Sequence, residues 1–150
     1  MNTIANELES FIEQHTASIL QIPEEIFLHK LTPAKWSKKE IIGHLIDSAH
    51  SNIRRFIVAQ YEDNPTIVYN QEKWVAINNY QQWNNNQLIR LWYLLNNQVV
   101  EILKNTSAEI AGRTCFTNES QTVQWLAADY IKHLRHHIHQ VLDLSPFAYP

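Results

Sequence analysis

Four long stretches of this chain repeat their apolar residues at the spacing of an α-helix, and no other feature constrains the fold as strongly. This periodicity predicts helices over residues 3–20, 38–61, 87–104 and 122–142. Only 2 glycines occur in 150 residues, which leaves few positions for tight turns and favours long helices joined by a few loops. We therefore predict an all-α fold, a four-helix bundle that forms one domain over residues 1–150.

Local signals predict where the helices begin and end. Ser37 is followed three residues later by Glu40, and this capping box predicts a helix that starts at residue 38. The Asn64-Pro65 pair marks the end of that helix. A shorter helix is predicted over residues 71–83, with the asparagines at 84–86 as its break, and residues 105–121 are predicted to be an irregular connection.

Charge and hydropathy exclude several classes of partner. The net charge is −3, and the longest basic cluster, residues 132–139, has one Lys and one Arg, so we expect no nucleic-acid partner. No apolar run approaches the roughly 18–20 residues of a membrane span, and residues 1–9 lack the basic cluster of a signal peptide. The single cysteine, Cys115, has no partner for an internal disulfide. We expect a soluble, cytoplasmic protein with no membrane partner.

The 8 histidines are the compositional feature that points to chemistry. His133 and His137 are four residues apart, which puts them on one helix face, on or beside the apolar stripe of the predicted fourth helix. Two imidazoles so placed can bind one metal ion at about 2.0–2.1 Å each. The alternative is a pair of inward histidines that simply form hydrogen bonds in the core. Burying two imidazoles without partners would be costly, which favours a metal ion. His136 and His139 are predicted to face solvent.

The helical periodicity does not settle whether His44 faces the core or solvent. This residue lies off the apolar face of the predicted second helix, in a group that also contains Ser48, Asn52 and Arg55. Periodicity alone predicts a solvated histidine. The same polar stripe is also consistent with the lining of a cleft that opens to water at one side of the bundle.

Other metal signatures are missing from the sequence. The histidine run at residues 133–137 lacks the Glu of the HExxH metalloprotease motif. No Glu is followed by His three residues later, whereas ferritin-like di-iron bundles need that spacing on two helices. Neither class of site is expected.

Two segments resemble those of DinB-like proteins. Trp36-Ser37, followed by Ile-Ile-Gly-His-Leu-Ile-Asp-Ser at residues 41–48, resembles their W-S-…-H-L/V-x-D-S segment, and residues 133–137 resemble their closing H-x-x-H-H. Residues 55–56, 62–67 and 72–74 are similar to the YfiT branch, which resembles bacillithiol-transferase-like proteins and metal-dependent hydrolases. The likeness covers nearly the whole chain. Gly43 and Ala49 depart from it, because that branch often has histidines at these two positions.

The resemblance implies more than the helical pattern does. It implies up-down-down-up connectivity, a homodimer, and one divalent metal ion, zinc or nickel, held by His44, His133 and His137. It also implies a thiol S-transferase, in which the metal holds a low-molecular-weight thiol as the thiolate that attacks an electrophilic small molecule.

Two other functions stay open at this point. One is a metal-dependent hydrolase that uses a bound hydroxide, and the other is a non-catalytic, stress-related metal-binding bundle. The sequence identifies no general base and no other catalytic residue. Asp47 is either a hydrogen-bond partner that orients a ligand histidine or a surface charge.

Overall fold

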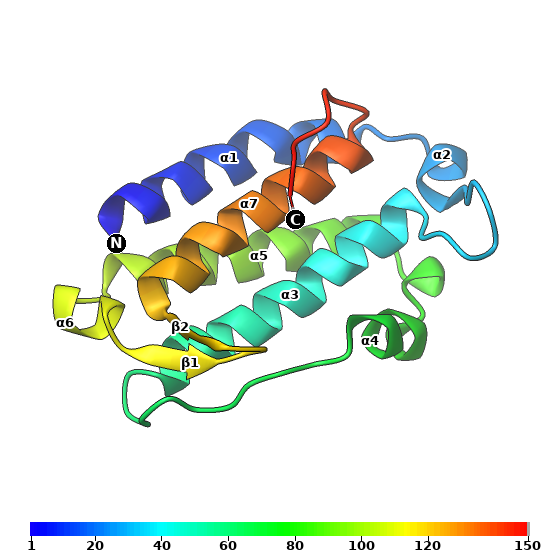
Figure 1. Ribbon diagram of the computed structural model, residues 1–150. Helices are drawn as coiled ribbons and strands as arrows, with labels where there is room; N and C mark the ends of the chain where they lie inside the picture. Colours follow the sequence, from blue (N-terminus) through cyan, green and yellow to red (C-terminus); the bar gives the residue numbers. More distant parts are fainter. Residues whose placement is uncertain (150) are drawn as a thin grey trace.

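Four long helices lie side by side in the computed structural model, which describes residues 1–149 (Figure 1). They are α1 (Asn2–Leu20), α3 (Lys38–Val58), α5 (Asn85–Lys104) and α7 (Val123–Val141). Helices α1 and α7 run in one direction and α3 and α5 in the other, so the connectivity is up-down-down-up. Each of α1 and α3 packs against both α5 and α7. The predicted four-helix bundle is thereby confirmed, with each helix end within three residues of its predicted position.

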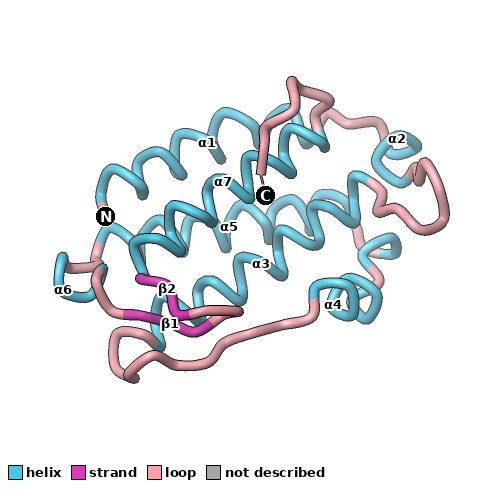
Figure 2. The backbone as a smooth tube through the Cα atoms, in the orientation of Figure 1, coloured by secondary structure: helices cyan, strands magenta, loops and turns pink. Residues whose placement is uncertain are grey.

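Smaller elements join the long helices. Helix α2 (Glu24–Leu28) follows α1, while α4 (Gln71–Asn78) and the 3₁₀ helix η1 (Tyr80–Gln82) precede α5. Figure 2 shows the small hairpin of β1 (Thr114–Phe116) and β2 (Ser120–Thr122) between α6 (Ala108–Ala111) and α7. The prediction of an irregular connection over residues 105–121 was therefore wrong. Strands of three residues and a helix of four are too short to give a readable hydrophobic period.

Side-chain caps fix the starts of the helices as their sequences suggest. Ser37 accepts a hydrogen bond from the Glu40 backbone N–H, and the Glu40 carboxylate accepts one from the Ser37 N–H, which confirms the capping box. Asn84 caps α5 by accepting from the Gln87 N–H. The asparagines at 84–86 therefore form the start of α5, and α5 begins two residues earlier than predicted.

The apolar faces of the long helices meet in one continuous core. The stripe of α7 that the periodicity identified is buried, and so are the large aromatic side chains Phe56, Trp92 and Tyr130. Tyr130 satisfies its hydroxyl group by donating to Oδ1 of Asn96 at 2.7 Å. No helix within residues 1–149 is long and apolar enough to cross a membrane.

One glycine of α3 lies directly under an aromatic ring from another part of the chain. A Cβ atom built on Gly43 would lie 2.0 Å from Cδ2 of Tyr80, so the tyrosine ring sits directly on the glycine backbone. Tyr80 donates its hydroxyl to Oδ1 of Asp47 at 2.6 Å, and Asn78 donates to the same oxygen at 3.1 Å. These bonds hold the end of α4 and η1 on α3.

Asp47 is thus a buried structural acceptor, with 1% of its surface exposed, so the surface-charge interpretation was wrong. Its hydrogen bonds go to Tyr80 and Asn78 and, within the described part of the chain, to no histidine ring. Burial raises the pKa of the Asp47 carboxyl to about 6.

We expect Gly43→Ala to destabilise the protein by about 1–3 kcal/mol, because the added methyl group forces Tyr80 off the helix. The matched control is Gly112→Ala, whose Cβ would meet only the Glu109 carbonyl at 3.5 Å. That change should be neutral or stabilise by up to about 1 kcal/mol, since alanine has less backbone entropy to lose. Urea unfolding of the two variants checks this, and equal stabilities would contradict it.

Candidate metal centre

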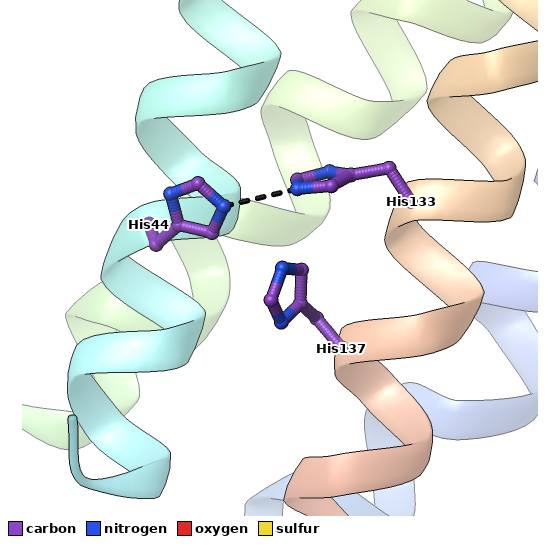
Figure 3. Close-up of side chains that lie close together, drawn as sticks. All are labelled: His44, His133 and His137. Atoms are coloured by element: carbon purple, nitrogen blue, oxygen red, sulfur yellow. Dashed lines mark hydrogen bonds between the residues drawn. The ribbon is translucent and has the colours of Figure 1, made fainter. Parts of the chain in front are cut away.

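Three histidines from two antiparallel helices point toward one another (Figure 3). His44 comes from α3, and His133 and His137 come from successive turns of α7. One ring nitrogen from each lies within 4.8 Å of the other two. The Nε2 atoms of His44 and His133 are 3.0 Å apart. The structure therefore brings together the three residues that the family resemblance named.

His44 is buried, with 1% of its surface exposed, so the solvated histidine that periodicity predicted was wrong. The reason is that α3 is covered on more than its apolar face. Helix α5 packs on one side of α3, while α7, α4 and η1 cover others. The neighbouring polar residues Ser48 and Asn52 are buried as well, which agrees with the cleft interpretation of the polar stripe.

Hydrogen bonds outside the triad orient two of the rings. Nδ1 of His137 lies 2.9 Å from Oε1 of Gln140, an acceptor, so the proton of the neutral ring belongs on Nδ1. The lone pair of His137 is then on Nε2, which faces the other two rings in Figure 3. Nδ1 of His133 lies 3.5 Å from the Ser48 hydroxyl. Nδ1 of His44 is buried and has no hydrogen-bond partner within residues 1–149.

Burial keeps the three rings uncharged. Burial, with a smaller contribution from the neighbouring His137, lowers the pKa of His44 to about 3 and that of His133 to about 2. Burial also lowers the pKa of His137. All three are neutral imidazoles at pH 7, the form that binds a metal ion.

This donor set fits one divalent ion. Ligands at about 2.0–2.1 Å in a tetrahedral shell stand about 3.3–3.4 Å from one another, and the triad nitrogens already lie within 4.8 Å. Three imidazoles leave one position of such a shell without a protein donor. Catalytic zinc sites have this layout, whereas structural sites are closed by a fourth protein ligand.

Two cavities meet at His137. The first, of about 790 Å³, is lined by Trp36, Ile26, Leu31 and the lysines at 35 and 38, and we call it the Trp36 cavity. The second, of about 690 Å³, contains the polar stripe of α3, and we call it the Arg55 cavity. Its lining includes Ser48, Asn52, Arg55, Tyr69, His133 and Tyr149. Because His137 lines both cavities, the triad can be approached from two sides.

The other two histidines of α7 do not simply face solvent, as the sequence predicted. His136 and His139 are half-buried, and their Nδ1 atoms lie 2.7 Å and 2.6 Å from the carbonyl oxygens of Phe147 and Ser145. The chain after α7 folds back along that helix (Figure 1), and Tyr149 donates its hydroxyl to Asp129 at 2.9 Å. A return of the chain without regular structure leaves no periodic signal in the sequence.

Comparisons with known proteins agree with this fold. A family model described as the DinB superfamily matches residues 6–141. YfiT from Bacillus subtilis, described as a probable metal-dependent hydrolase with an unusual four-helix bundle topology, superposes with a TM-score of 0.79 at 19% sequence identity. The match covers 94% of this chain and 85% of YfiT.

A second solved structure, the mycothiol-dependent maleylpyruvate isomerase, superposes with a TM-score of 0.69 at 16% identity. The match covers 98% of this chain but only 60% of the length of that isomerase. At these identities the two likenesses show a shared fold. A search of curated proteins found no match.

We expect the metal-free protein to lose stability as the pH falls below about 6.5. Unfolded histidines bind protons near that pH, whereas the folded His44 and His133 stay neutral down to about 3 and 2. Each histidine then removes about 1.4 kcal/mol of stability per pH unit. His137 acts in the same direction, because burial lowers its pKa too. Asp47 acts in the opposite sense between its folded pKa of about 6 and its unfolded value, so it offsets part of this loss.

Urea unfolding at several pH values between 7 and 4 measures this slope. His133→Gln should be less sensitive to acid than the unsubstituted protein, because one of the histidines that stay neutral in the folded state is gone. The same pH dependence in both proteins would contradict the assignment.

Proposed function

The chain belongs to the DinB superfamily, and from that premise we propose that it is a metal-dependent enzyme whose single divalent ion is held by His44, His133 and His137. The observation that carries this proposal is the convergence on one point of three neutral imidazoles, one of them buried and two half-buried. Zinc or nickel suits such nitrogen ligands. The homodimer that the family resemblance implies stays a prediction.

We propose that the reaction joins a low-molecular-weight thiol to an electrophilic small molecule. A divalent ion held by the three histidines would lower the pKa of a thiol. In the proposed reaction the thiol sulfur would form a bond to an electrophilic carbon, the displaced pair of electrons would stay with the leaving group or the adjacent atom, and the thiol proton would pass to solvent. The protein side chains would position the ion and the two reactants. Gln140 orients His137, and both cavities are lined by His137.

Two observations support a two-reactant enzyme. The Trp36 cavity combines an apolar wall of Trp36, Ile26, Leu31 and Ile41 with charged side chains at its edge, whereas the Arg55 cavity is lined mainly by polar side chains, so the two differ in the molecule that they suit. One protein of the same fold is mycothiol-dependent by name. A second candidate function is metal-assisted hydrolysis, which the description of YfiT favours. It would use a bound water in place of the thiol.

We expect the purified protein to carry about one divalent ion per chain at pH 7–8. Alanine at any one of His44, His133 and His137 should abolish stoichiometric binding, because two imidazoles form an incomplete chelate. Gln140→Ala should weaken binding by about 10–100-fold, since it only orients a ligand. Metal analysis by mass spectrometry provides the measurement.

The matched control for metal binding is His139→Ala, which removes a histidine of the same helix that hydrogen-bonds to the C-terminal segment. It should retain the ion. His136→Ala should also retain it, with some loss of affinity, because the His136 ring bonds to Gln140, which orients His137. Full metal content in His44→Ala would refute the triad, and the site would then be a two-histidine chelate.

The metal-loaded protein should consume an electrophile such as a halonitroarene only when a small thiol is added, and His44→Ala should reduce the rate to the uncatalysed background. A product analysis should find the thioether. Turnover without thiol would favour hydrolysis over transfer. The control is His139→Ala, which should keep the thiol-dependent rate.

A further inference from the structure

Arg55 of α3 lines the same cavity as His133 and His137. Its guanidinium is held from two sides. Nε and Nη2 donate to the Ile67 carbonyl at 3.2 Å and 3.1 Å, and Nη1 donates to Oδ1 of Asn52 at 3.3 Å. The side chain is therefore fixed in position at the wall of the cavity.

The positive charge of Arg55 has no ion-pair partner within the described residues, whereas Arg113 and Arg135 pair with Asp63 and Glu7. Arg55 is also half-buried, and burial lowers its pKa although a guanidinium stays charged. Removing an unpaired cation from water is costly. An anion that entered the cavity would offset that cost.

Two acidic side chains line the Arg55 cavity. Neither forms an ion pair with Arg55, although the negative charge of Asp129 acts to raise the pKa of the guanidinium. Oδ2 of Asp129 accepts the hydroxyl of Tyr149, and Oε1 of Glu119 accepts from Gln121 at 2.8 Å. Their charges disfavour a ligand with two negative charges such as a phosphate dianion, which would be repelled by both. A single negative charge is the better match.

We propose that Arg55 binds the carboxylate of a small organic acid that occupies the cavity beside the histidine triad. A guanidinium has five N–H donors, and three hydrogen bonds to Ile67 and Asn52 leave two for the two oxygens of a carboxylate. This inference rests on the proposed function in one respect: the bound acid is taken to be one of the two reactants. The binding itself needs no metal ion and can be measured separately.

Small monocarboxylates provide the test on the metal-free protein. Benzoate should bind and benzamide, its uncharged counterpart of equal shape, should bind much more weakly, as measured by calorimetry and ligand-observed NMR. Arg55→Gln should weaken benzoate binding at least about tenfold, and Arg55→Lys should retain part of it, because the charge remains but the two parallel donors do not. The matched control is Arg54→Gln, an exposed arginine one residue earlier on the same helix, which should bind benzoate normally.

A second measurement avoids substitution, since Arg55 also anchors the chain at Ile67. Phenylglyoxal modifies accessible arginines, and peptide mass spectrometry reports the extent at each one. Benzoate should slow the modification of Arg55 in the unsubstituted protein while leaving Arg54 unaffected, and benzamide should protect neither.

The outcomes separate this inference from the proposed function. Undiminished benzoate binding in Arg55→Gln, equal protection by benzoate and benzamide, or no binding of benzoate at millimolar concentration would overturn the carboxylate site, even if thiol transfer were observed. Arginine-dependent benzoate binding and protection would support the site, even if the metal-loaded protein transferred no thiol.

Discussion

The packing of three imidazoles, one buried and two half-buried, between α3 and α7 is the constraint on which the rest of the structure depends. Each ring carries a donor and an acceptor nitrogen that must find partners once water is excluded. In this chain the Nε2 atoms of His44 and His133 face each other at 3.0 Å, while Nδ1 of His44 has no partner in residues 1–149. Burial also keeps the rings neutral. A divalent ion would use the converging lone pairs, which explains why the fold tolerates so many polar atoms at one point.

The surroundings of α3 make this burial possible. Tyr80 packs on Gly43 and donates to Asp47, so that η1 and the end of α4 cover the helix one residue from His44. A side chain at position 43 would displace that cover. The departure of Gly43 from the YfiT pattern therefore has a structural reason, because the position is filled from outside by an aromatic ring.

Sequence periodicity predicted the features that depend on local interactions. The four long helices, the Ser37 capping box and the shared face of His133 and His137 all follow from residues near one another in the chain. His44 was misplaced by the same reasoning, since its ring packs against Trp36 and against His133 and His137 of α7, which is distant in sequence. The family resemblance placed it correctly because a motif carries information about tertiary contacts that a helical period lacks.

Other features depend on tertiary contacts that no local pattern contains. The hairpin at residues 114–122, the return of the chain over His136 and His139, and the unpaired charge of Arg55 in its cavity are of this kind. In the last case the sequence showed a polar stripe on α3 and left its surroundings open. The structure shows that the stripe faces a cavity that also contains two of the three histidines.

X-ray absorption spectroscopy of the metal-loaded protein tests the central claim most directly. The account predicts three imidazole nitrogens at about 2.0–2.1 Å and a further position filled from solvent, with one imidazole fewer in any weakly loaded His44→Ala sample. A shell with four protein donors, or one that is the same with and without His44, would contradict it.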